Sequence, residues 1–217
     1  MILVKFPTRS RPELFLKTLS DYIRLAKDNS RIQYLISIDN DDETMTDYVI
    51  NQAQAFHPNV VFFKGDSKTK IQACNADIEK ANPWEIILLI SDDMKVGLLN
   101  WDQRIIEDFN GNYDQCMWYF DGYQKRVCTL SCVGKDYYNR FGYLYHPSYK
   151  SFFCDNEFTE VAQGAGKIKL IGIPIIKHMH PSWGNGVPDD ALYQRNDTHW
   201  AFDEENYFKR RACGFPI

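Results

Sequence analysis

The chain has 217 residues, of which 44% are hydrophobic, and its 25 basic and 29 acidic residues give a net charge of −4. This balance excludes the strongly basic surface of nucleic-acid-binding proteins, so we expect no nucleic-acid partner. The longest apolar runs, such as "IILLI", are too short to span a membrane, and "MILVKFPTRSRP" lacks the pattern of a signal peptide. The six cysteines form no C-x-x-C pair, so we expect a cytoplasmic protein with reduced thiols and no transmembrane segment.

The first 100 residues alternate between strand and helix patterns. Near-continuous apolar runs predict buried strands, and apolar residues at helical spacing predict the helices between them. The predicted strands cover residues 2–6, 32–38, 59–63 and 85–90, and the predicted helices cover residues 12–27, 45–56 and 69–81. Three strand–helix units that lead into a fourth strand predict an α/β fold with a mostly parallel central sheet and helices on both faces.

The second half of the chain is less regular. It predicts helices over residues 96–109 and 155–166, strands over 116–123 and 127–134, and a strand pair or bent strand over 167–180. No repeat or linker interrupts the sequence, so we expect a single domain over 1–217. Its nucleotide-binding half would be 1–100, and 101–217 would form a smaller, mixed acceptor-binding half with a C-terminal flap and tail.

Polar side chains follow three of the four predicted strands, in "PTRSRP", "DNDDE" and "SDD". The carboxyl ends of parallel strands meet at one edge of a sheet, where ligands bind. There we expect Arg9 and Arg11 to reach a pyrophosphate, and Asp39 to accept hydrogen bonds from a base or ribose. Asp92 and Asp93 repel each other, and Mn²⁺ or Mg²⁺ shared with a phosphate would offset that repulsion. The alternative for "SDD" is an ordinary turn after the strand.

These segments together resemble the GT-A glycosyltransferases, specifically the family-2-like group. "FPTRSRP" is similar to that group's opening "PTRNR" segment, which implies that Pro7 and Thr8 lie against the nucleotide base. Asp39 matches the group's base-contacting aspartate. "SKTKIQACNADIEKANPWEIILLISDDM" resembles the block that ends in its D-x-D motif. The resemblance covers residues 2–100 well and the rest loosely, and it implies a GT-A (Rossmann-like) fold.

The D-x-D motif differs from that pattern at one position. Ser91 stands where the group has its first acidic residue. The resemblance therefore assigns the metal-binding role to Asp93, and leaves Ser91 or Asp92 to contact the ribose.

A second block, "FFCDNEFTEVAQGAGKIKLIG", resembles the part of the family that supplies the catalytic base. The resemblance implies that Asp155 deprotonates the acceptor hydroxyl, with Glu157 as the next candidate. The alternative is that Asp155 caps the helix that follows it.

The segment "KHMHPSWGNGVPDD" carries two histidines. His178 and His180 are two residues apart on a predicted strand, so their side chains point to the same face. The resemblance implies that one of them is a further metal ligand. A flap follows, in which Trp183 is expected to close over the ligand and Gly184 and Gly186 to act as hinges.

Two further sets of residues are candidates for ligand contact. Lys68 and Lys70 precede the predicted helix over 69–81, and either help to bind phosphate or form a solvated helix start. An acceptor sugar is expected to stack on a polar and aromatic stretch that contains Trp118, Tyr119, Asp121 and Tyr123.

The leading prediction is a metal-dependent glycosyltransferase that moves a sugar from a nucleoside-diphosphate sugar to a carbohydrate or other hydroxyl acceptor. Asp39 suits the imide edge of uracil or thymine, which favours UDP- or dTDP-sugars, with UDP-sugars as the leading choice, and the resemblance favours inversion. Three alternatives remain: a nucleotide- or sugar-binding module without turnover, a phosphatase that uses Asp39 and Asp41, and a nucleotidyltransferase, against which the glycine-free "PTRSRP" argues. The basic cluster in "YFKRRACGF" indicates a solvated helix end or weak peripheral membrane contact.

Overall fold

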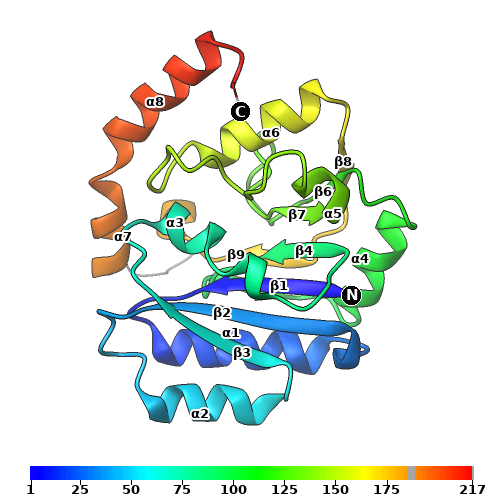
Figure 1. The fold of residues 1–217 in the computed structure, drawn as a ribbon, viewed down its shortest axis with the longest axis vertical. Helices are drawn as coiled ribbons and strands as arrows, with labels where there is room; N and C mark the ends of the chain where they lie inside the picture. Colours follow the sequence, from blue (N-terminus) through cyan, green and yellow to red (C-terminus); the bar gives the residue numbers. More distant parts are fainter. Residues whose placement is uncertain (185–188, 217) are drawn as a thin grey trace.

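The computed structural model describes residues 1–184 and 189–216, which form one large sheet, one small sheet and the helices around them (Figure 1). The large sheet has seven strands in the order β3-β2-β1-β4-β7-β6-β8. Its strands are β1 (Ile2–Pro7), β2 (Ile32–Asp39), β3 (Val60–Gly65), β4 (Ile86–Leu89), β6 (Cys116–Tyr119), β7 (Cys132–Gly134) and β8 (Ile168–Ile171). The small sheet pairs β5 (Met94–Val96) with β9 (Ile176–His178).

Strands β3, β2, β1 and β4 run parallel, and β7 is the one strand of the large sheet that runs against its neighbours β4 and β6. Every residue of β1 except Pro7 is buried, which is the burial expected for the centre of a parallel sheet. The predicted α/β fold with a mostly parallel sheet is therefore confirmed.

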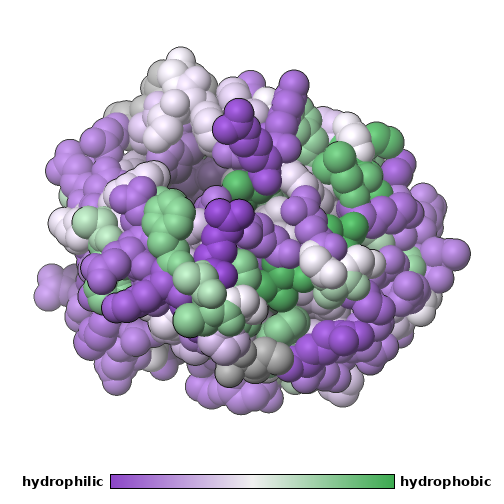
Figure 2. All heavy atoms as spheres, turned by 90° about the horizontal axis from the view of Figure 1, so that it is seen from above, coloured by the Kyte–Doolittle hydropathy of each residue, from purple (hydrophilic) through white to green (hydrophobic). Residues whose placement is uncertain are grey.

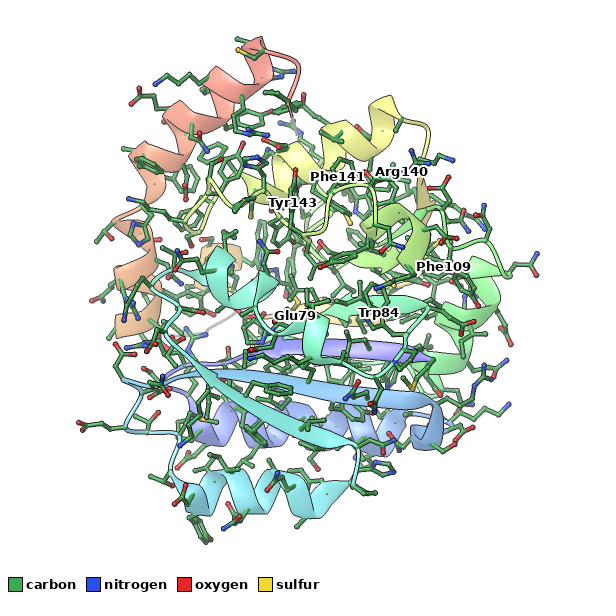
Figure 3. All side chains as sticks on the ribbon, viewed as in Figure 1. Glu79, Trp84, Phe109, Arg140, Phe141 and Tyr143 are labelled. Carbon is green, nitrogen blue, oxygen red and sulfur yellow. The ribbon has the colours of Figure 1, made fainter. Side chains whose placement is uncertain are left out.

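Helices cover both faces of the sheet, as predicted (Figure 1). In that view α1 (Pro12–Leu25) and α2 (Asp47–Phe56) lie below it, and α3 (Lys70–Asn75) and α6 (Cys154–Gly164) lie above it. Alternate residues of β1 supply the two cores: Val4 packs with the core that includes α1, and Leu3 packs with the core that includes α6. Figure 3 shows the side chains that fill the space on both sides of the sheet.

Two predicted helices are shorter than their patterns suggested. The helix predicted over 69–81 stops at Asn75, because Asp77 has a left-handed backbone (φ 65°) and a 3₁₀ turn, η2 (Ile78–Lys80), follows. The Asn75 side chain instead donates to the Tyr145 carbonyl at 2.6 Å. The helix predicted over 96–109 is α4 (Trp101–Phe109), because Val96 belongs to β5.

The strands predicted over 116–123 and 127–134 are confirmed only as the short strands β6 and β7. Residues between them leave the sheet because Asp121 accepts hydrogen bonds from the backbone of Tyr123 and Gln124 (2.9 and 2.7 Å) and from the Thr129 hydroxyl (2.6 Å). A carboxylate that satisfies the backbone in this way stabilises a loop in place of a strand ladder.

The segment after Pro181 was expected to hold a flap and a tail, with a helix end at the basic cluster of "YFKRRACGF", and the last turn of α8 (Trp200–Ala212) does carry Lys209, Arg210 and Arg211. The segment also contains η3 (Pro181–Trp183) and α7 (Ala191–Asp197); the other short elements are η1 (Asn29–Arg31) and α5 (Lys135–Tyr138). Gly186, a predicted hinge of the flap, lies outside the described residues.

All six cysteines are free thiols, five of them buried. Within residues 1–184 and 189–216, no helix is both long and apolar enough to cross a membrane. On the face drawn in Figure 2 hydrophilic side chains predominate, and apolar ones lie in separate groups.

Candidate active site

A cavity of about 420 Å³ lies where the ends of β1, β2 and β4 meet the start of α6 and the helices α7 and α8. It is the position expected for a ligand of an open parallel sheet. The predicted nucleotide-binding, metal-binding and catalytic residues line it, except for Arg11 and Glu157: Pro7, Thr8, Arg9, Asp39, Lys70, Asp92, Asp93, Asp155, His178 and His180. The stretch on which an acceptor sugar was expected to stack does not line it: Trp118, Tyr119 and Asp121 are buried elsewhere, and Tyr123 also lies outside the lining. The structure therefore brings together side chains that are up to 173 residues apart in the sequence, from Pro7 to His180.

Asp92 forms a buried ion pair with Arg11. Arg11 Nη1 donates to Asp92 Oδ1 at 2.9 Å, and both side chains are almost fully buried. Burial and the neighbouring charge of Asp93 raise the pKa of Asp92 to about 6, although Arg11 opposes that rise. Arg11 also donates two hydrogen bonds to Asp190 (2.7 and 2.8 Å) and lies 4.1 Å from the centre of the Tyr193 ring. Arg11 thus supports the cavity wall from outside the lining and neutralises Asp92.

Asp93 is surrounded by donors. Ser91 donates to its Oδ1, the Tyr193 hydroxyl donates to its Oδ2 at 2.8 Å, and His178 Nε2 lies 3.6 Å from Oδ2. Burial would raise the pKa of Asp93, but His178 and Ser91 hold it below its usual range. Burial would likewise lower the pKa of His178, but Asp121 and Asp93 raise it to about 9.

Asp93 and His178 fit a divalent cation. With ligand distances of about 2.1 Å on each side, one ion can bridge atoms that lie 3.6 Å apart. The other ring nitrogen of His178, Nδ1, is buried without a hydrogen bond, and Asp121 lies 3.7 Å from it, on the side where a carboxylate supports a metal-bound histidine. The described residues hold no group of three or more His, Cys, Asp or Glu placed for a metal ion. A cation here would therefore take its remaining ligands from a bound molecule or water.

His180 is a neighbour of His178, as the strand pattern predicted, with ring centres 5.7 Å apart. Its Nδ1 accepts a hydrogen bond from the Ser182 backbone, and its ring packs edge-on against Tyr193 at 4.7 Å. The distance from His178 to Asp93 makes His178 the better placed of the two histidines to share a cation with that carboxylate.

Asp155 lies in the first turn of α6 and faces the cavity. The residue at the N-cap is Phe153, so the alternative that Asp155 caps this helix was wrong. No ion pair to Asp155 occurs within the part of the chain that the structure describes. Burial raises its pKa, and Lys70 opposes that rise. Burial would also lower the pKa of Lys70 itself, but nearby negative groups, Asp93 and Asp155 among them, raise it.

Three solved structures share this fold. A mannosyltransferase from Pyrobaculum calidifontis in complex with GDP-Man and Mn²⁺ aligns with 97% of this chain and 64% of its own, at 12% identity and a TM-score of 0.72. GalNAc-T7 with UDP, GalNAc and Mn²⁺ aligns with 100% of this chain and 53% of its own, at 12% identity and a TM-score of 0.66. S. aureus TarS with UDP-GlcNAc aligns with 90% of this chain and 64% of its own, at 12% identity and a TM-score of 0.62.

The chain has the GT-A fold. It spans between 53% and 64% of the length of these three structures. No protein-family model matches the sequence, and no curated protein matches it. The fold expected from the sequence is thereby confirmed, and at 12% identity the likeness carries no more than the fold.

Within this GT-A fold, Glu157 is not brought to the cavity. It forms a two-point ion pair with Arg210 of α8 (2.7 and 2.8 Å) and accepts a hydrogen bond from the Tyr149 hydroxyl at 2.7 Å. The physical reason is the helical period: residues two apart on a helix point to nearly opposite sides, so Glu157 turns away when Asp155 faces the cavity. Glu157 ties α6 to α8.

Arg9 spans two carboxylates after β2. Its Nη1 donates to Asp39 Oδ2 at 2.8 Å and to Asp41 Oδ1 at 2.6 Å. Burial raises the pKa of Asp39, and Arg9 limits that rise. Asp39 and Asp41, the pair that a phosphatase would use, are therefore both bonded to the Arg9 guanidinium. Arg9 was predicted to contact a pyrophosphate, and in this structure it is paired with these two aspartates.

Several residues of the site were missed from the sequence. Tyr193 and Asp190 come from the segment expected to be a loose flap and tail, and Ser151, Phe152 and Trp200 line the cavity from α8 and the loop before α6. One signal was present: Asp190 accepts hydrogen bonds from the first backbone amides of α7, and an aspartate in that place is a common helix start.

Proposed function

We propose that the protein is a glycosyltransferase that moves a sugar from a nucleoside-diphosphate sugar to a hydroxyl group of an acceptor. The observation that carries this proposal is that a single cavity holds both the Asp93–His178 pair, which is suited to a cation, and Asp155, a carboxylate that has no ion pair among the described residues. The three glycosyltransferase structures that share the fold support the reaction class.

In the proposed reaction Asp155 is the general base. It takes the proton of the acceptor hydroxyl, and the oxygen attacks the anomeric carbon of the donor sugar. The bond between that carbon and the diphosphate oxygen breaks, and its electron pair leaves with the nucleoside diphosphate. A single displacement of this kind inverts the configuration at the anomeric carbon.

Other residues stabilise the departing group. Lys70 lines the same cavity, and the negative charges of Asp93 and Asp155 are among those that raise its pKa. It is placed to bind negative charge that develops on the diphosphate. Asp93 and His178 would hold a divalent cation, which would supply further positive charge to the same group. A carboxylate and an imidazole together favour Mn²⁺ over Mg²⁺, which prefers oxygen ligands alone.

The nucleoside is proposed to bind at Pro7, Thr8, Arg9 and Asp39, where β1 and β2 end. Asp39 has one oxygen engaged by Arg9, and a carboxylate retains capacity to accept the imide N–H of uracil. UDP is therefore the proposed donor nucleotide, and two of the three structures named above contain UDP or UDP-GlcNAc.

One observation favours a second candidate, a binding module without turnover. Asp93 already accepts hydrogen bonds on both oxygens, and Ser91 occupies the first acidic position of the D-x-D motif. A protein of this kind would bind nucleotide without dependence on a cation.

A thermal-shift panel tests the proposal, with UDP, GDP, dTDP and CMP each in Mn²⁺, Mg²⁺ or EDTA. At about 100 times Kd we expect UDP with Mn²⁺ to raise the melting temperature by about 5–10 °C, and EDTA or Asp93→Asn to abolish the rise. Asp136→Asn, an exposed aspartate of α5, is the matched control and should leave the rise unchanged.

The other outcomes are equally specific. A rise that persists in EDTA supports the binding module, and a larger rise with GDP corrects the donor nucleotide. No rise with any nucleotide contradicts the transferase proposal.

A further inference from the structure

An aromatic wall closes the α8 side of the cavity. Trp200, at the start of α8, packs against Phe152 and Phe153 in the loop before α6, with ring centres 4.9 and 5.0 Å apart. Both Trp200 and Phe152 line the cavity, and Trp200 remains 50% exposed. A large aromatic ring that is packed on one side and open to a cavity on the other is available to stack against a ligand.

Next to this wall is a buried hydroxyl with no hydrogen-bond partner. Ser151 is 4% exposed and lines the cavity, yet its Oγ has no partner within the described part of the chain. Buried polar atoms without a partner are rare, and each calls for an explanation such as a missing ligand or water. Trp183 Nε1, on the segment that also borders the cavity, is a second such atom.

The backbone of the loop that carries Ser151 and Phe152 is anchored by hydrogen bonds to one buried carboxylate, Asp203. Asp203 of α8 is fully buried and accepts hydrogen bonds from the backbone amides of Lys150, Ser151 and Phe152 at 2.9, 2.7 and 2.8 Å. These three bonds to a charged acceptor fix the loop that leads directly into α6 and Asp155. The wall and the proposed general base are thus parts of one continuous, anchored segment.

We propose that Ser151, Phe152 and Trp200, called here the acceptor wall, bind the acceptor, and that this acceptor is a carbohydrate. A sugar ring presents C–H groups on its face, which pack on Trp200 and Phe152, and hydroxyls at its edge, one of which bonds to Ser151 Oγ. A lipid acceptor would need an apolar channel, whereas the residues that precede Trp200 in the lining are polar, Asn196, Asp197 and His199 among them. The assignment of this sugar as acceptor rests on the function proposed above.

Saturation-transfer NMR on the intact chain tests the proposal, with cellobiose, maltose, diacetylchitobiose and α-1,2-mannobiose as probes. We expect at least one disaccharide to receive saturation on the C–H face of one ring. Trp200→Ala should weaken its binding about tenfold, Ser151→Ala should weaken it about fivefold, and Trp200→Phe should retain it. Phe202→Ala is the matched control, because Phe202 is an aromatic of the same helix that is 49% exposed and does not line the cavity.

The outcomes separate this inference from the proposed function. If no disaccharide binds, or if Trp200→Ala binds the same disaccharide as well as the native chain, the acceptor wall is refuted, whatever the nucleotide panel gives. If the disaccharide binds at the wall but nucleotides do not bind at all, the transferase proposal fails and a sugar-binding site remains. If Trp200→Ala instead raises the KM for the nucleotide sugar and leaves the KM for the acceptor unchanged, the wall binds the donor sugar and the inference is overturned.

Discussion

The two ends of the cavity differ in how their polar groups are satisfied. At the donor end, which consists of Arg9, Arg11, Asp39, Asp92 and Asp93, every charged side chain has a partner of opposite charge or a hydrogen-bond donor. At the other end Asp155 accepts a backbone hydrogen bond from Asn156 at 3.0 Å but has no ion pair among the described residues, and Ser151 Oγ has no hydrogen-bond partner there. The donor end is preorganised by internal pairs, whereas the acceptor end leaves groups free for a ligand and for chemistry.

The largest effect is expected at the unpaired end, from Asp155→Asn. The amide cannot take the acceptor proton, so kcat for transfer should fall about 10³-fold, within the range for loss of a general base. The donor end is untouched, so the melting-temperature rise with nucleotide should persist. Steady-state transfer assays and the thermal-shift panel measure the two effects, and a kcat within tenfold of the native value would remove Asp155 from the mechanism.

The second-largest effect is expected on stability, from loss of the Arg11–Asp92 ion pair at the donor end. Arg11→Ala leaves Asp92 buried without its cation, and we expect a loss of about 3 kcal/mol in the free energy of unfolding. The double variant Arg11→Ala/Asp92→Asn should recover part of that loss, because it removes the unpaired charge as well.

Urea denaturation measures both variants. Arg24→Ala is the control, since its ion pair with Asp21 is largely exposed and should contribute less than about 0.5 kcal/mol. Equal losses for Arg11→Ala and Arg24→Ala would show that the burial of the Asp92 pair has no energetic consequence.

A third change separates the two acids of α6. Glu157→Gln weakens the buried pair with Arg210, so we expect a loss of about 2 kcal/mol in the free energy of unfolding and kcat within about threefold of the native value. This is the reverse of Asp155→Asn, which should affect kcat and spare stability. A hundredfold loss of kcat in Glu157→Gln would return this residue to the chemistry.

The smallest effect is a pH dependence. Burial raises the pKa of Asp155 in the folded chain, although Lys70 opposes the rise. The folded chain therefore holds this proton to higher pH than the unfolded chain, so the contribution to stability is full below the ordinary aspartate pKa of about 3.9 and is lost as pH rises through the folded value.

Asp155→Asn does not titrate, so the native chain should lose stability relative to this variant as pH rises above the ordinary aspartate pKa of about 3.9. Paired urea titrations at pH values on both sides of that pKa measure the difference. If the variant is instead the less stable chain at pH 7, the folded chain stabilises the ionised Asp155, and Asp155 is not the unpaired carboxylate described above.

Local pattern was sufficient for the first half of the molecule. The apolar runs of β1, β2 and β4 and the helical spacing of α1 and α2 predicted the parallel sheet, because a strand buried on both faces must be almost continuously apolar. The position of Asp39, Asp92 and Asp93 at strand ends was enough to predict a shared site. The helix predicted over 69–81 ends at Asn75 because Asp77 takes a left-handed backbone, and the Asn75 side chain bonds instead to residues 144 and 145, which lie far along the chain.

The sequence by itself determined the sheet, its faces and the edge at which ligand-binding carboxylates gather, since periodicity and strand ends are local properties. Only the tertiary structure decided the partners: Arg11 with Asp92 and Asp190, Tyr193 with Asp93, Glu157 with Arg210, and Asp203 under the loop that carries Ser151. Each of these contacts joins residues that are more than 50 positions apart. The sequence does not show whether a charged residue is paired or free. The fold determines this, because it sets which groups lie within hydrogen-bond distance of that residue.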